Sequence, residues 1–240
     1  ILKALEPDVL LLQELDGDDE SETIGTFLHE TLGGSWSVGL SDVSGTKRHH
    51  KLRCAVTSSK PTHSVTRVGE APLKAILATI DVDEKPIHFV SLHLRCCGGP
   101  SGEEEDQRQE EAHQIRNTLD SMQNPSCIIA GDWNLVGTMA PLEIVQSDTL
   151  QIVNACQPDG RCNATWSDES SAFTPGRLDW MLYSPATLQV VNSFILDSSD
   201  FDSDTLQLYH LNATDTAKLS DHLPLVADFK VLKPVEEEVQ

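Results

Sequence analysis

The sequence predicts an α/β or α+β domain with two layers of β-sheet. Short apolar runs bounded by turn residues recur along the chain and indicate strands, while two segments with helical apolar spacing indicate helices between some of them. No internal repeat or low-complexity linker interrupts this pattern. At 240 residues the chain is long enough for one sizeable core, so we expect a single domain over residues 1–233, followed by an acidic tail at 234–240.

The N-terminal part predicts a helix end, a strand and a second helix. Residues 1–5 are typical of a last helical turn, which Pro7 stops. The apolar run 9–12 is typical of a strand covered on both faces, and it ends at Gln13 and Glu14. From residue 18 apolar side chains recur at helical spacing until Gly33 ends the pattern.

The middle of the chain is rich in predicted strands, at residues 36–40, 52–57, 73–82 and 87–94. Side chains alternate between the two faces of a strand, and His93 lies near the end of the last one. Side chains at a strand end emerge into a crevice, so His93 is a candidate functional residue.

The C-terminal half begins with a helix and continues with three strands. Ser101 and Glu104 form a capping-box pattern that opens the helix, whose apolar positions continue to Met122. The strand 127–130 is of the buried type and stops at Gly131. Strands at 178–183 and 223–229 follow, with irregular polar segments between them.

The charge balance limits the kinds of partner. There are 38 Asp and Glu against 17 Lys and Arg, a formal net charge of −21. Such a surface repels nucleic acid at long range, which argues against binding through a broad basic face. A carboxylate cluster that holds Mg²⁺ or Ca²⁺ would nevertheless make the local potential positive. No run approaches the roughly 20 apolar residues of a membrane span, so we expect a soluble protein.

The six cysteines form no recognisable disulfide scaffold or zinc motif. Cys156 and Cys162 flank a turn-rich stretch and either close a small disulfide loop, as in a secreted or periplasmic protein, or are two unrelated thiols. Cys96 and Cys97 directly follow His93, but no other cysteine or histidine has the spacing of a soft-metal site. The chain starts at Ile1 without a signal peptide, so we interpret it as an excised segment whose targeting is unknown.

Ionisable and amide side chains gather at the ends of predicted strands. Taken singly, each has an ordinary interpretation: Asp132 could cap a turn, Asp179 could pair with Arg177, Glu14 could face solvent, and His222 could be a core histidine. Together they suggest a site for a hard metal ion and for proton transfer, because carboxylates beside core residues must find a donor or a cation. This set comprises Glu14, His93, Asp132, Asn134, Asp179, Asp221 and His222.

At these residues the sequence resembles the endonuclease/exonuclease/phosphatase superfamily, also called DNase I-like. The resemblance rests on five motifs in order along the chain. They are Leu12-Gln13-Glu14, His93-Leu94, Gly131-Asp132-Trp133-Asn134, Arg177-Leu178-Asp179-Trp180 and Ser220-Asp221-His222-Leu223-Pro224. The resemblance implies a four-layer α/β/β/α sandwich of two mixed sheets, with the site at the mouth between them. It also implies a first strand, bearing an Asn, that is missing from this chain.

The resemblance implies a role for each residue in metal-dependent phosphoester hydrolysis. Glu14 would ligate Mg²⁺ or Mn²⁺, assisted by Asp221. Asp132 would deprotonate the attacking water or share in metal binding, and Asn134 would hold a phosphate oxygen. His222, oriented by Asp179, would stabilise the transition state.

Three further residues complete the expected site. The resemblance implies that His93 would donate to a phosphate oxygen or to the leaving group. Arg53 and Arg177 are candidate substrate contacts, with surface ion pairing as the alternative.

We therefore expect a phosphodiesterase or nuclease that acts as a monomer, with nucleic acid favoured among phosphoester substrates on the breadth of the family. Three alternatives stay open. The first is a lipid or inositol phosphate phosphoesterase resembling sphingomyelinases, although no hydrophobic hairpin or basic amphipathic helix is evident. The second is a catalytically silent binding module on the same fold. The third is a Ca²⁺-stabilised extracellular domain, which only the acidity supports.

Overall fold

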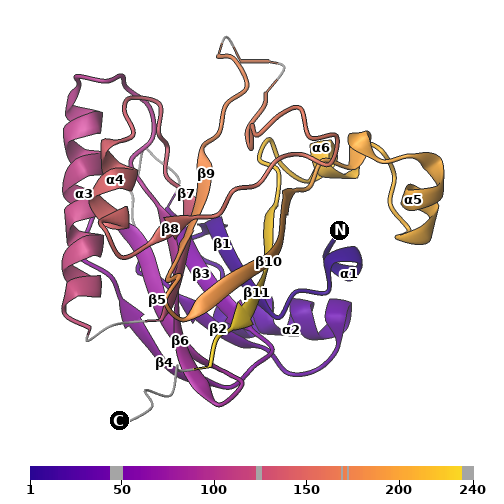
Figure 1. Ribbon diagram of the computed structural model, residues 1–240, viewed down its shortest axis with the longest axis horizontal. Coiled ribbons are helices and arrows are strands. Elements are labelled where there is room, and N and C mark those ends of the chain that lie inside the picture. The colour runs from indigo at the N-terminus through magenta and orange to yellow at the C-terminus, as the bar shows by residue number, and fades with distance from the viewer. Residues whose placement is uncertain (44–50, 123–125, 169, 172, 234–240) are drawn as a thin grey trace, which may run out of the picture.

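A six-stranded mixed sheet lies at the centre of the computed structural model, which describes residues 1–43, 51–122, 126–168, 170–171 and 173–233 (Figure 1). The strand order is β4-β5-β6-β7-β9-β8. β6 and β7 run parallel, and the other neighbours are antiparallel. The strands are β4 (Thr62–Arg67), β5 (Lys74–Val82), β6 (Lys85–His93), β7 (Cys127–Asp132), β8 (Gln151–Ile152) and β9 (Asp179–Tyr183).

A second layer of strands packs against one face of this sheet and has two parts. One is a three-stranded sheet of order β1-β3-β2, and the other is the antiparallel pair β10-β11. Apolar side chains from both parts share one core with the central sheet. Within the described residues β1 pairs with β3 alone and β11 with β10 alone. The strands are β1 (Val9–Asp16), β2 (Ser37–Leu40), β3 (Leu52–Ser58), β10 (Leu188–Ile195) and β11 (Leu225–Val231).

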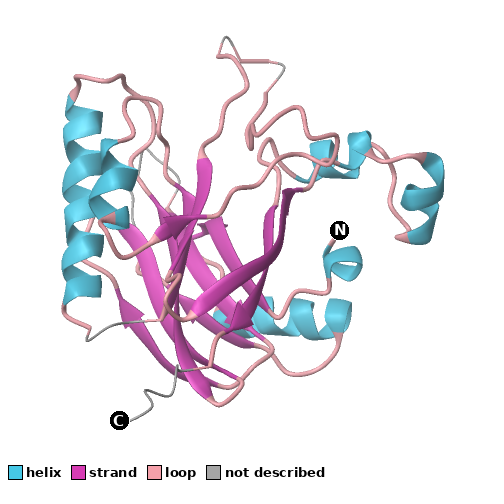
Figure 2. Ribbon diagram, viewed as in Figure 1, coloured by secondary structure: helices cyan, strands magenta, loops and turns pink. Residues whose placement is uncertain are grey.

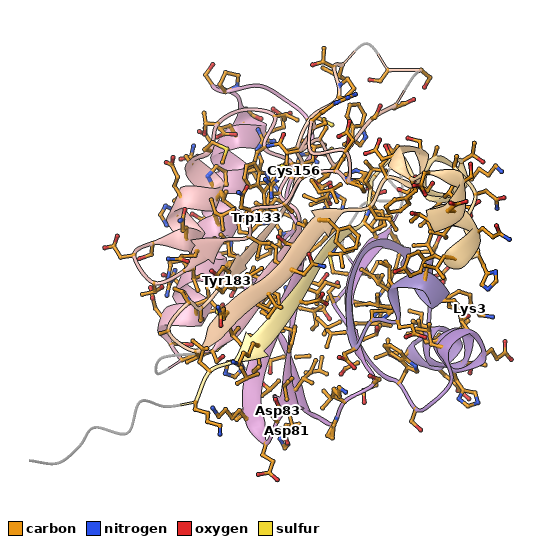
Figure 3. The ribbon with its side chains drawn as sticks, turned by 45° about the vertical axis from the view of Figure 1, so that its right-hand side comes forward. Lys3, Asp81, Asp83, Trp133, Cys156 and Tyr183 are labelled. Carbon is orange, nitrogen blue, oxygen red and sulfur yellow. The ribbon has the colours of Figure 1, made fainter. Side chains whose placement is uncertain are left out.

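Helices form the two outer layers (Figure 1). α3 (Glu103–Asp120) and α4 (Ala140–Gln146) cover the other face of the central sheet, and a second core that contains Trp133 fills the space beneath them (Figure 3). α1 (Leu2–Leu5) and α2 (Ser21–Leu32) lie on the opposite side, where α2 packs on β2. The α/β/β/α order confirms the expected fold class.

A set of short helices follows β10 and extends beside the main body (Figure 2). It comprises η1 (Ser198–Asp200), α5 (Ser203–Leu208) and α6 (Asp215–Leu219). In the described part of the chain, no helix combines the length and the apolar character that a membrane crossing requires.

The capping-box expectation at α3 was wrong. The helix is capped by Gly102, without a side-chain hydrogen bond, although its first turn is acidic as expected. Glu104 does not reach back to Ser101 because its side chain packs over Gly98, where an added Cβ would lie 2.7 Å from the Glu104 Oε2 atom.

The burial expected for the first strand was also wrong. Residues 9–12 were expected to be covered on both faces, yet β1 contains no buried residue. In the described part of the chain it pairs with β3 alone, so no neighbouring strand covers its other edge and its residues are partly exposed. The strand also continues past Glu14 to Asp16, through a register shift between Leu12 and Leu15.

Several elements were not predicted from the sequence. The segments thought to be irregular contain α4, β8, β10, α5 and α6, and β4 was missed as well. β4 is mostly exposed and polar, and β8 has only two residues, so neither gives a recognisable apolar run. The expected acidic tail at 234–240 lies outside the described residues.

All six cysteines are free thiols in this structure. Cys156 and Cys162 flank a turn, but backbone hydrogen bonds close it: the Gln157 amide donates to the Cys162 carbonyl, and the Gly160 amide donates to the Gln157 carbonyl. The interpretation of two separate thiols therefore describes this pair.

Candidate active site

Three neighbouring strands bring their polar ends to one edge of the central sheet. β6 ends at His93, β7 ends at Asp132, and β9 begins at Asp179. His93 pairs in register with Asp132, and Asp132 pairs with Asp179, so the three residues are consecutive across the sheet. Figure 2 shows loops gathered at this edge. Residues 39 and 47 positions apart in sequence therefore become direct neighbours.

The close approach of β6 and β7 requires a glycine before Asp132. Gly131 has φ +151°, and a Cβ atom at this position would lie 1.9 Å from the Leu92 carbonyl oxygen. No side chain fits at that distance. On the other side of Asp132, Trp133 is fully buried and donates its Nε1–H to the Trp180 carbonyl at 3.0 Å. Asp132 is thus fixed between a backbone contact and an anchored indole.

Asn134 holds the Asp132 carboxylate in place. Its backbone amide donates to Asp132 Oδ1 at 2.8 Å, and its side-chain Nδ2 donates to Oδ2 at 2.9 Å. Asn134 adopts φ +48°, a left-handed conformation that asparagine tolerates better than most residues. Burial, and next the neighbouring Asp179, raise the pKa of Asp132 to about 7. Near neutral pH this carboxylate can therefore either hold or accept a proton.

His222 forms a close pair with Asp179. The distance between His222 Nδ1 and Asp179 Oδ2 is 2.7 Å, and the side chains are 26% and 14% exposed. Burial alone would lower the pKa of His222, but the hydrogen bond and charge of Asp179, and then the charge of Asp132, raise it to about 9. The imidazolium form therefore prevails at neutral pH, and the pair contradicts the alternative in which Asp179 binds Arg177.

Two residues that sequence reasoning missed hold this pair in position. Thr165 is fully buried, and its hydroxyl oxygen accepts hydrogen bonds from the Leu178 and Asp179 amides at 3.0 and 2.9 Å. Trp166 forms a β-bridge with His222. Both lie in a polar segment that the sequence predicted only as irregular. A hydroxyl group that binds the backbone of a distant strand leaves no pattern in a single sequence.

His93 is a neutral, deeply buried imidazole. Its side chain is 4% exposed, and its Nδ1 atom has no hydrogen-bond partner among the residues that the structure describes. Burial, followed by the charges of Lys74 and His222, lowers the pKa of His93 to about 3. Its Nε2 atom lies 3.6 Å from Asp132 Oδ2 and 3.9 Å from Glu14 Oε1, beyond hydrogen-bond range. Two carboxylates therefore converge on this ring.

Glu14 reaches the same place from the second layer of strands. Gln13 donates to the Ser91 hydroxyl at 2.8 Å, and Ser91 donates to the Leu12 carbonyl at 2.9 Å, which ties β1 to β6 two residues before His93. Glu14 then turns with φ +57°, and its side chain is 62% exposed. This carboxylate lies at the solvent-facing mouth of the site.

Lys74 is a cation of the site that the sequence reasoning did not find. It is the first residue of β5, it pairs in register with His93, and it is half-buried. In the residues that the structure describes, its ammonium group forms no hydrogen bond or ion pair. The sequence feature that could have identified Lys74 is the two-residue turn at Asp83 (Figure 3) and Glu84. Residues at equal distances before and after this turn pair across the hairpin, which places Lys74 opposite His93.

Three expected residues lie at the edge of this arrangement. The Asp221 carboxylate accepts from the Trp166 indole at 2.8 Å. Arg53 donates to the Ser41 and Asp19 carbonyls, both at 3.0 Å. Arg177 donates to the Val153 carbonyl at 3.1 Å, and its guanidinium carbon lies 4.1 Å from the centre of the Trp180 ring. Within the described chain, neither arginine forms an ion pair, so surface ion pairing does not describe them. Their roles as substrate contacts stay predictions.

The oxygen-rich donor set suits a hard cation better than zinc. Among the described residues, no three or more His, Cys, Asp or Glu side chains are placed as ligands of one metal ion. Zinc sites usually need three or four such ligands, whereas Mg²⁺ keeps several waters and binds one or two carboxylates. The exposed Glu14 carboxylate, with Asp132 close by, fits the second arrangement. Asp221 as a ligand stays a prediction.

Comparison with known proteins agrees with this fold. The sequence profile described as the Endonuclease/Exonuclease/phosphatase family matches residues 1–222. Among curated proteins, no sequence matches the chain significantly.

Solved structures with low sequence identity share the fold. The human Nocturnin catalytic domain with bound sulfate is 19% identical, with a TM-score of 0.64 over 96% of this chain and 83% of that one. TDP2 from D. rerio with a single-strand DNA product is 14% identical, with a TM-score of 0.65 over 95% and 88%. The 3′ phosphatase NExo from Neisseria, bound to a product DNA hairpin, is 18% identical, with a TM-score of 0.60 over 93% and 89%.

The strength of the His222–Asp179 pair can be measured without any substrate. Asp179→Asn should lower the pKa of His222 from about 9 toward its ordinary value of 6.5, because the variant removes the carboxylate charge. The pKa would be followed by NMR titration of the imidazole in EDTA. Because the folded-state pKa lies above the unfolded one, the pair stabilises the fold below about pH 6.5, and this stability is lost as pH rises through about 9.

Asp221→Asn is the matched control, since Asp221 is a weaker electrostatic neighbour of His222 than Asp179. It should lower the pKa by a smaller amount. Equal shifts in the two variants would mean that the close contact with Asp179 has no special role.

Proposed function

Because the chain belongs to the Endonuclease/Exonuclease/phosphatase family, whose members are phosphoesterases and nucleases, we propose that it hydrolyses a phosphoester bond with the help of Mg²⁺ or Mn²⁺. The observation that supports this most is the His222–Asp179 pair at 2.7 Å, beside the buried Asp132. A proton donor and a proton acceptor therefore lie at the same edge of the sheet, as in-line attack by water requires.

Asp132 is the proposed general base. With a pKa of about 7, its carboxylate can accept a proton from an attacking water at neutral pH. The two hydrogen bonds from Asn134 fix the plane of the carboxylate. Asn134 Nδ2 also donates to the Leu94 carbonyl at 3.2 Å, so both of its N–H donors are in use, and the amide would have to release one of them to hold a phosphate oxygen.

His222 is the proposed electrostatic partner of the transition state. Asp179 binds its Nδ1–H, which leaves Nε2–H to face the phosphoryl group. A fixed imidazolium placed where negative charge accumulates lowers the barrier more than an equivalent donor in water.

Lys74 and His93 complete the proposed phosphate pocket. Lys74 carries a positive charge beside His93 and forms no ion pair in the described chain, although its charge acts on Glu111, so an anionic substrate oxygen is its proposed counter-ion. His93 is neutral, and its ring can donate one hydrogen bond to a phosphate or leaving-group oxygen without adding charge.

Glu14 is the proposed principal metal ligand, with Asp132 or Asp221 as a second one. A bound Mg²⁺ or Mn²⁺ would neutralise charge on the phosphoryl oxygens. The exposed Glu14 carboxylate leaves room for the waters that Mg²⁺ retains.

The proposed substrate class is a phosphodiester or phosphomonoester at the end of a nucleic acid strand. Two neighbours in fold are a TDP2 complexed with a single-strand DNA product and a 3′ phosphatase bound to a product DNA hairpin. A net charge of −21 opposes binding along a long duplex, so recognition should use few phosphates close to the reacting one.

Hydrolysis of bis-p-nitrophenyl phosphate tests the proposed function directly. We expect activity that EDTA abolishes and that Mg²⁺ or Mn²⁺ restores better than Zn²⁺, because the proposed ligands are oxygen atoms. The assay would be repeated on short oligonucleotides with a 3′ or 5′ phosphate. If the metal ions stimulated hydrolysis of none of these substrates, the result would favour the catalytically silent binding module.

Replacement of the histidine pair tests the mechanism. His222→Ala should lower kcat by about a hundredfold or more without unfolding the protein, the usual scale for a lost transition-state donor. Asp179→Asn should cause a related loss, and the double variant should lose much less than the product of the two. Near-normal turnover of His222→Ala on a verified substrate would remove this residue from the mechanism.

Lys74→Gln tests the phosphate pocket. We expect kcat/KM to fall by about tenfold or more, because the variant removes a charge-assisted contact to the substrate. Lys60→Gln is the matched control, since Lys60 is exposed and already pairs with Asp8 at 2.9 Å. Equal decreases in kcat/KM for the two substitutions would show that the effect comes from the net charge of the protein and not from a contact of Lys74 with the substrate.

A further inference from the structure

Two adjacent thiols lie in the loop that follows the candidate catalytic strand β6. The distance between Cys96 Sγ and Cys97 Sγ is 2.8 Å. Cys97 is exposed and Cys96 is half-buried. Cys97 also has φ +71°, a left-handed conformation that a residue with a side chain seldom adopts. A neighbouring pair of thiols in contact, on a backbone this unusual, is not explained by packing.

The backbone around the two thiols is anchored from α3. Arg108 is fully buried and donates through Nη1 to the Arg95 carbonyl at 2.9 Å and to the Cys97 carbonyl at 2.7 Å. Its Nη2 atom lies 2.7 Å from Glu105 Oε2. The Arg95 amide donates to Glu111 Oε2 at 2.8 Å. The loop therefore holds the thiols together by fixing the carbonyls on either side of Cys96.

From this geometry we propose that Cys96 and Cys97 are a redox site that closes to a disulfide by exchange with a low-molecular-weight disulfide. The Cys97 thiolate attacks one sulfur of oxidised glutathione, and one glutathione thiolate leaves. The Cys96 thiolate then attacks the Cys97 sulfur of the mixed disulfide and releases the second glutathione. The two protein thiols are oxidised, the external disulfide is reduced, and the two protons pass to the released thiolates.

The exposures of the two thiols support this order of steps. Cys97 faces solvent and can meet a disulfide of small size. Burial, and next the hydrogen bond from Cys97, raise the pKa of Cys96 to about 11, which suits it to the intramolecular second step rather than the first. The product should be easy to reduce, because adjacent Cα atoms are about 3.8 Å apart, closer than the roughly 4.4 Å minimum of ordinary disulfides.

Closure would act on the proposed active site through the Leu94 carbonyl. This carbonyl accepts a hydrogen bond from the Asn134 side-chain amide, and Leu94 lies two residues before Cys96. A strained ring at Cys96 and Cys97 would pull on the carbonyls that Arg108 holds and would displace Asn134 from Asp132. This consequence rests on the proposed phosphoesterase function, whereas the redox chemistry does not.

The site is tested by mass spectrometry of the whole chain after treatment with oxidised glutathione. Trypsin cleaves after Arg95 and after Arg108, so both thiols fall in one peptide, residues 96–108, with no other cysteine. We expect this peptide to lose two hydrogen atoms, to carry no glutathione, and to regain both thiols with dithiothreitol. A peptide that stays a dithiol, or that keeps glutathione on Cys97, would overturn the proposal.

Three substitutions make the result specific. Cys96→Ser removes the second step, so the peptide should stop at a glutathione adduct on Cys97. The exposed pair Cys156 (Figure 3) and Cys162 is the matched control, and Cys156→Ser with Cys162→Ser should leave closure of the 96–97 pair unchanged. If the disulfide between Cys96 and Cys97 failed to form in that control variant, the oxidation would depend on Cys156 and Cys162, and the proposal would be wrong.

Turnover of a verified substrate tests the consequence. Oxidation should lower kcat by about tenfold in the unsubstituted chain, the scale of a small misplacement of a catalytic group, and dithiothreitol should restore it. A chain without activity in either state would contradict the proposed function and leave the redox result standing. Full activity of a chain whose peptide is oxidised would overturn the coupling to the active site.

Discussion

The backbone contact between β6 and β7 at Gly131 sets the positions of the groups on which the site depends. A Cβ at Gly131 would lie 1.9 Å from the Leu92 carbonyl oxygen, so the two strands can meet in this register only with glycine. The register places His93 beside Asp132, and the antiparallel β9 adds Asp179. Three ionisable groups then share a sheet edge that buries them, and their mutual electrostatics follow from that placement.

The ionisable groups of the site differ in charge because their surroundings shift their pKa values differently. Burial favours the neutral forms of Asp132 and His93, by raising the pKa of the first and lowering the pKa of the second. Contact with Asp179 instead keeps His222 charged. A single sheet edge therefore holds a carboxyl group that titrates near neutral pH, a neutral imidazole and an imidazolium. Such a divergence is what separates acid from base at a catalytic site. It requires no unusual residue, only different partners and different burial: the side chains of His93 and Asp132 are 4% and 8% exposed, and that of His222 is 26% exposed.

The sequence was sufficient to predict the fold class and most of the groups that converge, but not the means by which they are held. Glu14, His93, Asp132 and Asp179 each lie at or near a strand end, and strand ends are visible as breaks in apolar runs. Lys74 was missed because its significance depends on the β5–β6 register, which places it opposite His93, and no local motif marks it. Thr165 and Trp166 were missed because they act on β9 and His222 from a segment with no regular structure.

The acidity of the chain gives the few cations at the mouth their importance. With a net charge of −21, a distant phosphate polymer meets repulsion, whereas under the proposed function a phosphate group that reaches Lys74 and His222 would meet attraction. Arg53 and Arg177 add less to this positive region, because each guanidinium group already donates to a backbone carbonyl. Among the described residues this attractive region is small, and a phosphate group must come close to it before it gains energy. The proposed function therefore fits recognition of a single phosphoester better than recognition of a long strand.

The buried charges under α3 are best understood as a constraint on the loops of the site. Removing Arg108 and Glu105 from water costs energy that their mutual attraction does not reliably return, so stability alone does not explain a fully buried pair. Glu105 also accepts from Thr138, in the loop after Asn134, while Arg108 binds two carbonyls in the loop after His93. One ion pair thus fixes both loops relative to each other. If either loop moved, a buried charge would lose its partners, so the pair restricts the loops to one arrangement. In that arrangement Asn134 stays in contact with Leu94 and Asp132.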